Sequence, residues 1–301
     1  MAALRGLSAL VVLISLGSAD AALAELPDPV RAMLDAAIER EDQAALDTIA
    51  KFASETNPDD AKEIAEIVAD YKQSLAAEQE AEIREAGIFS LWKGSGELGG
   101  FITTGNTRST GISAGLSLQK SGIDWQHKFR AIVDYQRSDG VTTRNQWMAS
   151  YEPNFRLSEA IYAYGLAMYE KDRFQGFSDR VTASGGVGVR VLREADMKLD
   201  LKGGPAWRQT NWLDEPESTE FNTLAGADFL WHLSRSFELK NNTQIIWSSG
   251  NSTYNNTAAL TAKFNGKLSA RVSYAVRHET VPPPGSEPTD TITRATLVYD
   301  F

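Results

Sequence analysis

The sequence contains no cysteine, only three histidines, and no long apolar run after its first 24 residues. Without cysteine there is no disulfide framework, no cysteine nucleophile, no zinc knuckle and no c-type haem attachment. Without a run of about 20 apolar residues, no later segment can cross a bilayer as a helix, so strands would have to embed the chain in a membrane. A Walker loop, a dinucleotide fingerprint and a basic nucleic-acid patch are also missing. We therefore expect no cofactor, no metal site and no nucleic-acid partner.

The first 24 residues have the pattern of a secretory signal peptide. Arg5 supplies a positive charge, residues 7–16 are apolar, and Ala22-Leu23-Ala24 offers small residues for cleavage. Ten apolar residues are too few for a spanning helix. We predict a signal peptide over residues 1–24, cleaved after Ala24, with Ala19 as the second choice.

The rest of the chain changes character near residues 87–91. Residues 25–90 are rich in alanine and glutamate and contain 17 acidic against 6 basic residues. Residues 91–301 are richer in glycine, threonine, tryptophan and asparagine and contain 22 acidic against 23 basic residues. We therefore predict two parts, an acidic segment over residues 25–90 and a second domain over residues 91–301.

The acidic segment shows helix signals. Asp28 and Asn57 each precede a proline, which predicts a capping side chain followed by proline at the first helical position. Asp42 is a further candidate cap, and apolar residues at helical spacing predict a long third helix from Pro58 to about Arg84. We expect a small periplasmic helical segment that packs on itself or on the rim of the following domain. A partner-binding or oligomerising coiled coil is the alternative.

The second domain alternates apolar and polar residues between regularly spaced turn signals. Such strands suit a barrel with lipid outside and polar groups inside, and the mean hydropathy of −0.31 is compatible with it because inward polar residues lower the average. We predict a twelve-stranded antiparallel transmembrane β-barrel, with strands over residues 94–104, 107–120, 123–137, 141–155, 160–172, 179–192, 197–211, 219–232, 236–248, 253–264, 267–279 and 290–301.

Three features favour a membrane barrel over a β-sandwich. The strands exceed the roughly 9–11 residues that a tilted spanning strand needs. Short connections alternate with longer ones, as periplasmic turns and external loops do. Aromatic residues also stand at the ends of the apolar faces, where membrane-interface girdles occur. These interface aromatics are Trp125, Tyr135, Phe221, Trp231, Phe237 and Trp247.

Two strands fit this pattern poorly. Asn241 and Thr243 fall on the outward parity of residues 236–248. Residues 160–172 carry four large apolar side chains on the supposed inner face: Tyr162, Tyr164, Leu166 and Met168. The register of these two strands is therefore less well determined than the barrel class.

The inward parity carries a near-balanced set of charges. Opposite charges on neighbouring strands pair and fill a lumen, and twelve strands lie between the packed 8-stranded and the open 16-stranded barrels. We therefore predict a narrow or plugged lumen. The residues expected to line it are Lys128, Arg130, Asp134, Lys198, Asp200, Lys202, Arg208, Lys240, Arg271, Arg277 and Arg294.

The histidines are the only candidates for rim chemistry. We assign His127, His232 and His278 to the outward parity, with His278 near an outer rim. No serine lies two positions from His278 on its own face, which strand periodicity would require for a local nucleophile–base pair. We therefore expect interfacial structural histidines, no catalytic residues and no enzyme.

Several motifs resemble a known bacterial family, the domain-of-unknown-function family numbered 481, whose members are described as salt-induced outer-membrane proteins. The resemblance covers residues 91–301 and leaves out the acidic segment. It implies an outer-membrane barrel and a link with ionic stress, and it supplies no catalytic residues. Phe301 also looks like the signal read by outer-membrane assembly machinery. The motifs are Trp92 to Gly100, Thr104 to Thr107, Arg173 to Arg180, Gly185 to Gly188, Gly203 to Arg208 and Thr296 to Phe301.

Together these patterns favour a structural or narrow-channel protein of the Gram-negative outer membrane. Its expected partners are outer-membrane lipid and lipopolysaccharide, the assembly machinery, and a periplasmic partner of residues 25–90. Two alternatives stay open: a lipid-modifying enzyme at the rim that uses His278 or His127, and an envelope interaction protein that the barrel anchors.

Overall fold

The computed structural model describes residues 26–87, 90–104, 109–138, 141–282 and 287–301. The signal-peptide prediction for residues 1–24 lies outside these residues. The chain divides into two compact units, residues 1–81 and residues 82–301. Within the described residues, no helix is both long enough and apolar enough to cross a membrane.

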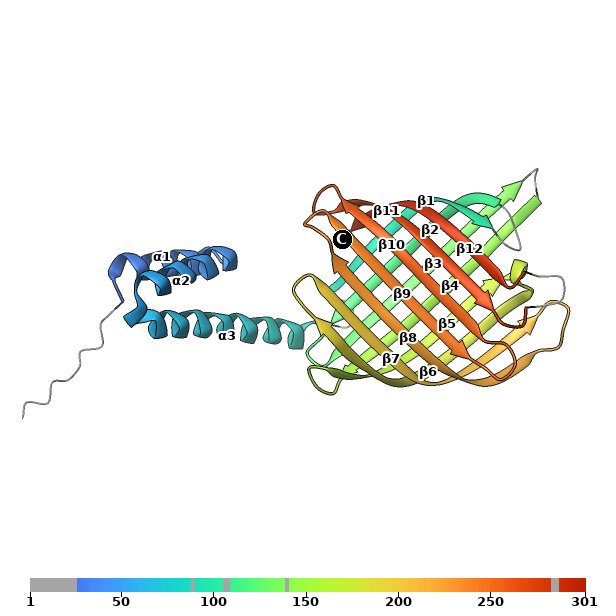
Figure 1. The fold of residues 1–301 in the computed structure, drawn as a ribbon, viewed down its shortest axis with the longest axis horizontal. Coiled ribbons are helices and arrows are strands. Elements are labelled where there is room, and N and C mark those ends of the chain that lie inside the picture. Colours follow the sequence, from blue (N-terminus) through green and yellow to red (C-terminus); the bar gives the residue numbers. More distant parts are fainter. Residues whose placement is uncertain (1–25, 88–89, 105–108, 139–140, 283–286) are drawn as a thin grey trace, which may run out of the picture. The chain divides into compact units, whose positions relative to one another are not determined.

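The first unit contains the helices α1 (Asp28–Glu39), α2 (Gln43–Thr56) and most of α3 (Ala61–Glu85), with a 3₁₀ turn, η1 (Pro58–Asp60), before α3 (Figure 1). Their apolar stripes meet in a small core, which removes apolar surface from water and holds these short helices together. The buried members of that core are Leu26, Leu34, Ala37, Leu46, Ala53 and Ile64.

The helix caps differ in part from the prediction. Asp42 caps α2 as expected, because its carboxylate accepts a hydrogen bond of 2.9 Å from the backbone N–H of Ala45. Asp28 does not cap α1; it is the first helical residue, and Pro27 takes the N-cap position. Asn57 precedes η1 without a side-chain capping bond, since its amide instead donates to the carbonyl of Ala53 at the end of α2.

The second unit is a closed barrel of twelve antiparallel strands, which confirms the predicted fold class. Each strand pairs with its neighbours in sequence, and β1 closes the barrel by pairing with β12. The strands are β1 (Trp92–Thr104), β2 (Ser109–Ser121), β3 (Trp125–Ser138), β4 (Val141–Arg156), β5 (Ile161–Asp172), β6 (Phe177–Arg193), β7 (Met197–Trp212), β8 (Ser218–His232), β9 (Phe237–Trp247), β10 (Thr253–Lys263), β11 (Leu268–Glu279) and β12 (Thr289–Asp300).

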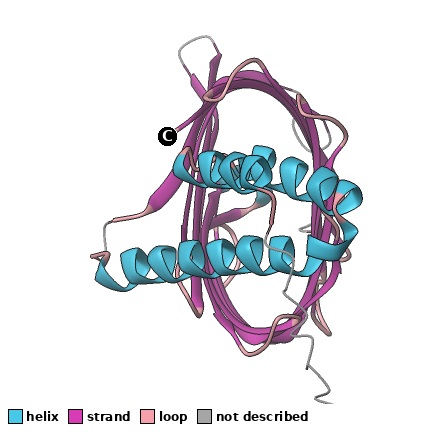
Figure 2. Cartoon of the chain, turned by 90° about the vertical axis from the view of Figure 1, so that its left-hand side faces the viewer, coloured by secondary structure: helices cyan, strands magenta, loops and turns pink. Residues whose placement is uncertain are grey.

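The barrel has two different ends. At one, which we call the terminal end, β1 begins and β12 ends, and the five turns are short, three or four residues each. At the other, the loop end, the connections include the longest one, between Glu279 and Thr289. The terminal end lies at the left of the barrel in Figure 1, and Figure 2 shows the strands as a closed, flattened ring.

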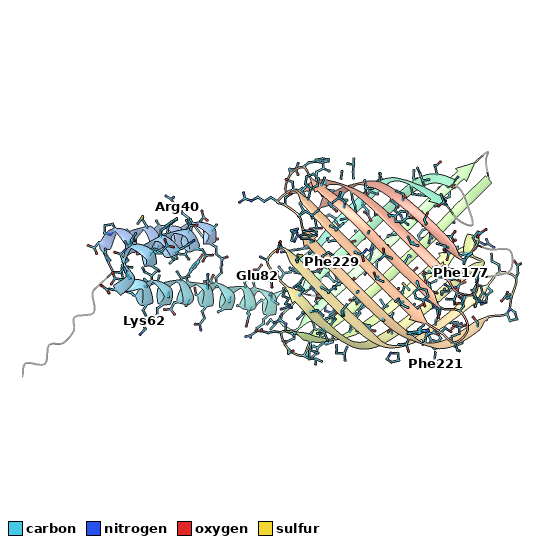
Figure 3. The ribbon with its side chains drawn as sticks, in the orientation of Figure 1. Arg40, Lys62, Glu82, Phe177, Phe221 and Phe229 are labelled. Carbon is cyan, nitrogen blue, oxygen red and sulfur yellow. The ribbon has the colours of Figure 1, made fainter. Side chains whose placement is uncertain are left out.

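Side chains alternate between the interior and the outer surface, as the two-residue period of a strand requires. The outward set exposes large apolar residues along the barrel, among them Leu98, Ile112, Val272 and Leu297. Phe221, labelled in Figure 3, is 86% exposed, whereas Phe177, also labelled there, is fully buried. The interior holds most of the buried charges, so the barrel is apolar outside and polar inside.

Candidate functional site: the charged lumen

All eleven residues predicted to line the lumen lie on the inward parity of their strands. Contacts across the interior establish this parity, such as the ion pair of 2.5 Å between Arg294 of β12 and Asp134 of β3. Large exposed apolar side chains occupy the alternate positions. Lys198, Asp200 and Lys202 follow one another at every second residue of β7 and share the lumen face.

The loop end of the lumen contains five charged residues that we call the loop-end cluster: Arg180, Arg208, Arg277, Glu170 and Glu279. Arg277 Nη1 lies 3.1 Å from Glu170 Oε1, and Arg277 Nη2 lies 2.9 Å from Glu279 Oε1. Arg180 Nη1 lies 3.4 Å from the same oxygen of Glu279. Arg180 is only 2% exposed, and the side chains of Arg277 and Glu170 are also nearly buried. These ions are therefore withdrawn from water and held by one another.

Two ion pairs of the loop-end cluster cross the barrel. In the ring of twelve strands, β5 and β11 stand six positions apart in either direction, so Glu170 and Arg277 bond from opposite walls. Arg180 and Glu279 come from β6 and β11, which are five positions apart. Ion pairs between opposite walls need the side chains to fill the space between them. The loop-end cluster therefore constricts the lumen.

Aromatic rings and hydroxyl groups support the cluster. The guanidinium carbon of Arg180 lies 4.1 Å from the ring centre of Phe177, within the range of a cation–π contact. Its Nε donates to Thr210 Oγ1 at 3.1 Å. Arg208 donates from Nη1 to Thr253 Oγ1 at 2.9 Å, three strands away. Buried guanidinium groups need such partners, because an unpaired one would lose its hydration without replacement.

The lumen carries further ion pairs that join strands over shorter spans. Arg271 Nη1 lies 3.0 Å from Glu97 Oε2, two strands away. Lys202 Nζ lies 2.5 Å from Glu152 Oε2, three strands away, and 3.5 Å from Asp228 Oδ2 on the adjacent strand. Lys128 also approaches Glu152, at 3.5 Å. The near balance of charge seen in the sequence thus takes the form of specific pairs.

One part of the lumen wall is apolar. The aromatic residues of β5 that fitted the pattern poorly do face inward, and Tyr162 fits over Gly188 of β6, where a Cβ atom would lie 2.1 Å from its ring. The cluster spans β5, β7, β8 and β9, and its side chains pack against one another along this part of the wall. Its members are Tyr162, Tyr164, Leu166, Ala206, Leu224 and Ile246.

The terminal end of the lumen holds a second group, the terminal-end cluster, which consists of Glu238, Lys240, Lys263 and His232. Glu238 lies 2.9 Å from Lys240 Nζ, 3.6 Å from Lys263 Nζ and 3.4 Å from His232 Nδ1. All four residues belong to the adjacent strands β8, β9 and β10. The side chains of Lys240 and Lys263 are 52% and 42% exposed, so the cluster lies on the wall and reaches solvent.

The contact with Glu238 corrects our assignment of His232. His232 pairs in register with Glu238 and lies on the inward face, not the outward one. It is an even number of residues from the inward residue Asp228, so correct counting along β8 places it inside. The other two histidines do face outward. His127 Nδ1 lies 2.8 Å from Tyr151 Oη, and His278 Nδ1 lies 2.8 Å from Thr289 Oγ1.

Sequence reasoning missed six charged residues that complete these pairs: Glu97, Glu152, Glu170, Arg180, Lys263 and Glu279. Glu97, Glu170 and Arg180 lie on β1, β5 and β6, where glycines or inward aromatic residues obscure the alternation. The register also shifts between Glu170 and Asp172 and between Phe177 and Asp179, which breaks a simple count of parity. One sequence signal could have revealed Glu170: it is a charged residue on the otherwise apolar inward face of β5.

The six predicted interface aromatics are exposed on the outer surface. Phe221 and Trp231 stand near opposite ends of β8, and Phe237 and Trp247 are the first and last residues of β9. Trp125 and Tyr135 occupy corresponding positions on β3. Each of these three strands thus has an outward aromatic residue near both of its ends.

A closed antiparallel barrel with an apolar outside and a charged lumen belongs to the transmembrane class of β-barrels. The chain belongs to the family described as "Protein of unknown function, DUF481", which matches residues 96–301. It is also similar to the uncharacterized protein YdiY of Escherichia coli strain K12, at 22% identity over 211 residues that cover 70% of this chain and 83% of YdiY.

Solved barrels of similar structure include two porins and a channel. A NanC porin matches with a TM-score of 0.49 at 10% identity, covering 69% of this chain and all of that one. An outer-membrane channel from Pseudomonas putida F1 matches with a TM-score of 0.46 at 10% identity, covering 72% of this chain and all of the channel. A KdgM porin matches with a TM-score of 0.40 at 9% identity, covering 69% of this chain and 99% of the porin.

Proposed function

We propose that the mature protein is a barrel of the Gram-negative outer membrane whose lumen is a narrow channel, constricted by the loop-end cluster. The observation that carries the proposal is the ion pair between Arg277 and Glu170, which joins opposite walls of the barrel. A side-chain bridge across a twelve-stranded barrel leaves room beside it for water and small ions but not for a wide solute.

The outer surface supports the membrane location. Its large exposed apolar residues would be costly in water and suit hydrocarbon, and the aromatic residues at both strand ends fit two membrane interfaces. The strands, of 11 to 17 residues, are long enough to span the bilayer. Outer-membrane lipid and lipopolysaccharide would then be the molecules that contact this surface.

The two ends of the barrel suggest an orientation. Short turns are typical of the periplasmic side and longer connections of the external side, so the terminal end faces the periplasm in this proposal. Residues 25–90 would then enter the periplasm as an acidic helical segment able to meet a partner there. Phe301, exposed at the same end, serves as the signal for the assembly machinery.

The proposal does not include catalysis. The contacts of His278 are the hydroxyl group of Thr289 and the ring of Tyr254, and neither is a carboxylate that would orient the imidazole as a base. His127 lies between the rings of Trp125 and Tyr151, parallel to both. These are contacts of interfacial aromatic residues. The link with ionic stress implied by the family resemblance would come from the channel, which is the only ion-handling feature in the proposal.

Planar-bilayer recording of the refolded full-length protein tests the proposal. Folded barrels migrate faster than heated ones on gels, so heat-modifiability first establishes that the sample is folded. We expect small unitary steps, well below those of a 16-stranded porin measured in the same salt. Large steady steps would contradict the constriction, and a folded protein that never inserts into bilayers would contradict the membrane location.

A further inference from the structure

Three polar side chains stand together on the outer surface of β9 and β10: Asn241, Thr243 and Asn256, which we call the amide cluster. They share the outward parity of Phe237 and Trp247, the exposed aromatic residues at the two ends of β9. Asn241 and Thr243 are at the centre of that strand. If the barrel spans the membrane as proposed above, the amide cluster lies at the level of the hydrocarbon core.

The cluster is bonded internally. Asn256 Nδ2 donates to Thr243 Oγ1 at 2.8 Å and to Asn241 Oδ1 at 3.1 Å. Asn241 Nδ2 donates to Asn256 Oδ1 at 3.3 Å, and Thr243 Oγ1 donates to Asn241 Oδ1 at 3.2 Å. An amide nitrogen carries two N–H groups. One N–H of Asn241 Nδ2 donates to Asn256 Oδ1. Among the described residues, no atom accepts a hydrogen bond from the second N–H of that nitrogen.

Both small and large apolar side chains border the amide cluster. Ala227 of β8 is opposite Thr243, Ala258 of β10 is opposite Asn241, and Ala225 is the next outward residue of β8. Phe229 of β8 is also opposite Asn241, and Val276 of β11 is opposite Asn256. Small residues beside polar ones are typical of surfaces where protein segments meet inside a membrane, because the backbones can approach closely.

An unsatisfied N–H facing lipid is unfavourable, since hydrocarbon offers no acceptor. Asparagine provides both donors and acceptors and is therefore complementary to itself. A second copy of this patch, turned by a two-fold axis, would offer an amide oxygen to each free N–H, as an isologous interface requires. The cluster is uncharged, so it holds no group that would favour a partner of opposite charge.

We propose that the outer surface of β8–β10 around the amide cluster is the contact surface for a second copy of this chain in the membrane. The inference rests on the membrane location proposed above, but not on the constriction of the lumen. It assigns this face of the barrel to protein and the remaining outer surface to lipid.

The absence of cysteine allows a direct test by single-cysteine cross-linking of full-length protein in lipid vesicles. Ala258→Cys places a thiol beside the amide cluster, and Ala183→Cys places one at an exposed alanine in the outward set of β6 as the matched control. With a short bis-maleimide we expect a band of twice the monomer mass from Ala258→Cys, several-fold stronger than from Ala183→Cys. Equal bands, or no dimer band from either variant, would overturn the proposal.

A second variant tests the amides themselves. Asn241→Leu/Asn256→Leu in the Ala258→Cys background should lower the dimer band several-fold while the barrel stays heat-modifiable. An unchanged band would show that the amides do not hold the contact. If the heat-modifiable Ala258→Cys protein fails to enter vesicles, the membrane location fails; if it enters but does not cross-link, only the contact surface fails.

Discussion

The two charged clusters of the lumen contain similar residue types and have different structures. In the loop-end cluster, Arg277 and Glu170 come from opposite strands and are nearly buried. In the terminal-end cluster, Glu238 meets Lys240 on its own strand and Lys263 on the adjacent strand, and both lysines are about half exposed. Charge alone therefore does not determine whether a lumen is open. Whether the partners bridge opposite walls or line a single wall also matters.

This difference has an energetic consequence. An exposed ion pair contributes little, because water solvates each partner nearly as well as the other partner does. A buried pair has lost that hydration, so removing one partner leaves a charge with nothing to replace the water. We therefore expect the loop-end cluster to control both conduction and stability, and the terminal-end cluster to adjust only the local field.

The largest expected effect is on conductance. Glu170→Ala/Arg277→Ala removes both halves of the bridge between opposite walls, leaves the net charge unchanged, and should raise the unitary conductance several-fold in planar bilayers. The matched control, Glu238→Ala/Lys240→Ala, also removes one acid and one base but from a single wall, and should leave the conductance near that of the parent. Equal conductance in the two variants would show that the bridge does not limit the passage of ions.

The next effect is on stability. Glu170→Ala alone leaves Arg277 buried with one carboxylate fewer and should lower the free energy of unfolding by about 3–5 kcal/mol. Lys263→Ala removes a half-exposed partner of Glu238 and should cost about 0–1 kcal/mol. Urea titration of both variants in the same vesicles, followed by loss of the heat-modifiable band, measures the difference. Similar midpoints would mean that the two clusters are equally solvated.

Much of the barrel could be predicted from the sequence, because its main signal is local. Alternation with a period of two assigns a residue to one face without knowledge of its neighbours, and so Lys202 and Arg271 were placed inside from their own strands alone. The strand count followed from turn signals in the same way. The cap at Asp42 was also predictable, since its carboxylate accepts a hydrogen bond from the backbone N–H of Ala45, only three residues further along the chain.

The cross-lumen pairing could not be predicted in this way. Which side chains meet across a barrel depends on how the barrel closes and on the stagger of its strands. Neither can be inferred from the sequence of a single strand. Irregular registers in β5 and β6 concealed Glu170 and Arg180, which are the partners that form the constriction. The aromatic inner face of β5 was similarly uninterpretable until the glycine opposite Tyr162 was known.

The smallest expected effect concerns ion selectivity at the terminal end. In the Glu170→Ala/Arg277→Ala background, Lys240→Ala/Lys263→Ala should shift the reversal potential toward cation preference in 0.1 M salt, where the Debye length is about 10 Å. In 1 M salt the Debye length falls to about 3 Å, so the shift should nearly vanish because these amino groups are open to solvent. A shift of equal size at both concentrations would indicate that the two lysines are shielded from salt, and the contrast between an enclosed cluster and an open one would then be wrong.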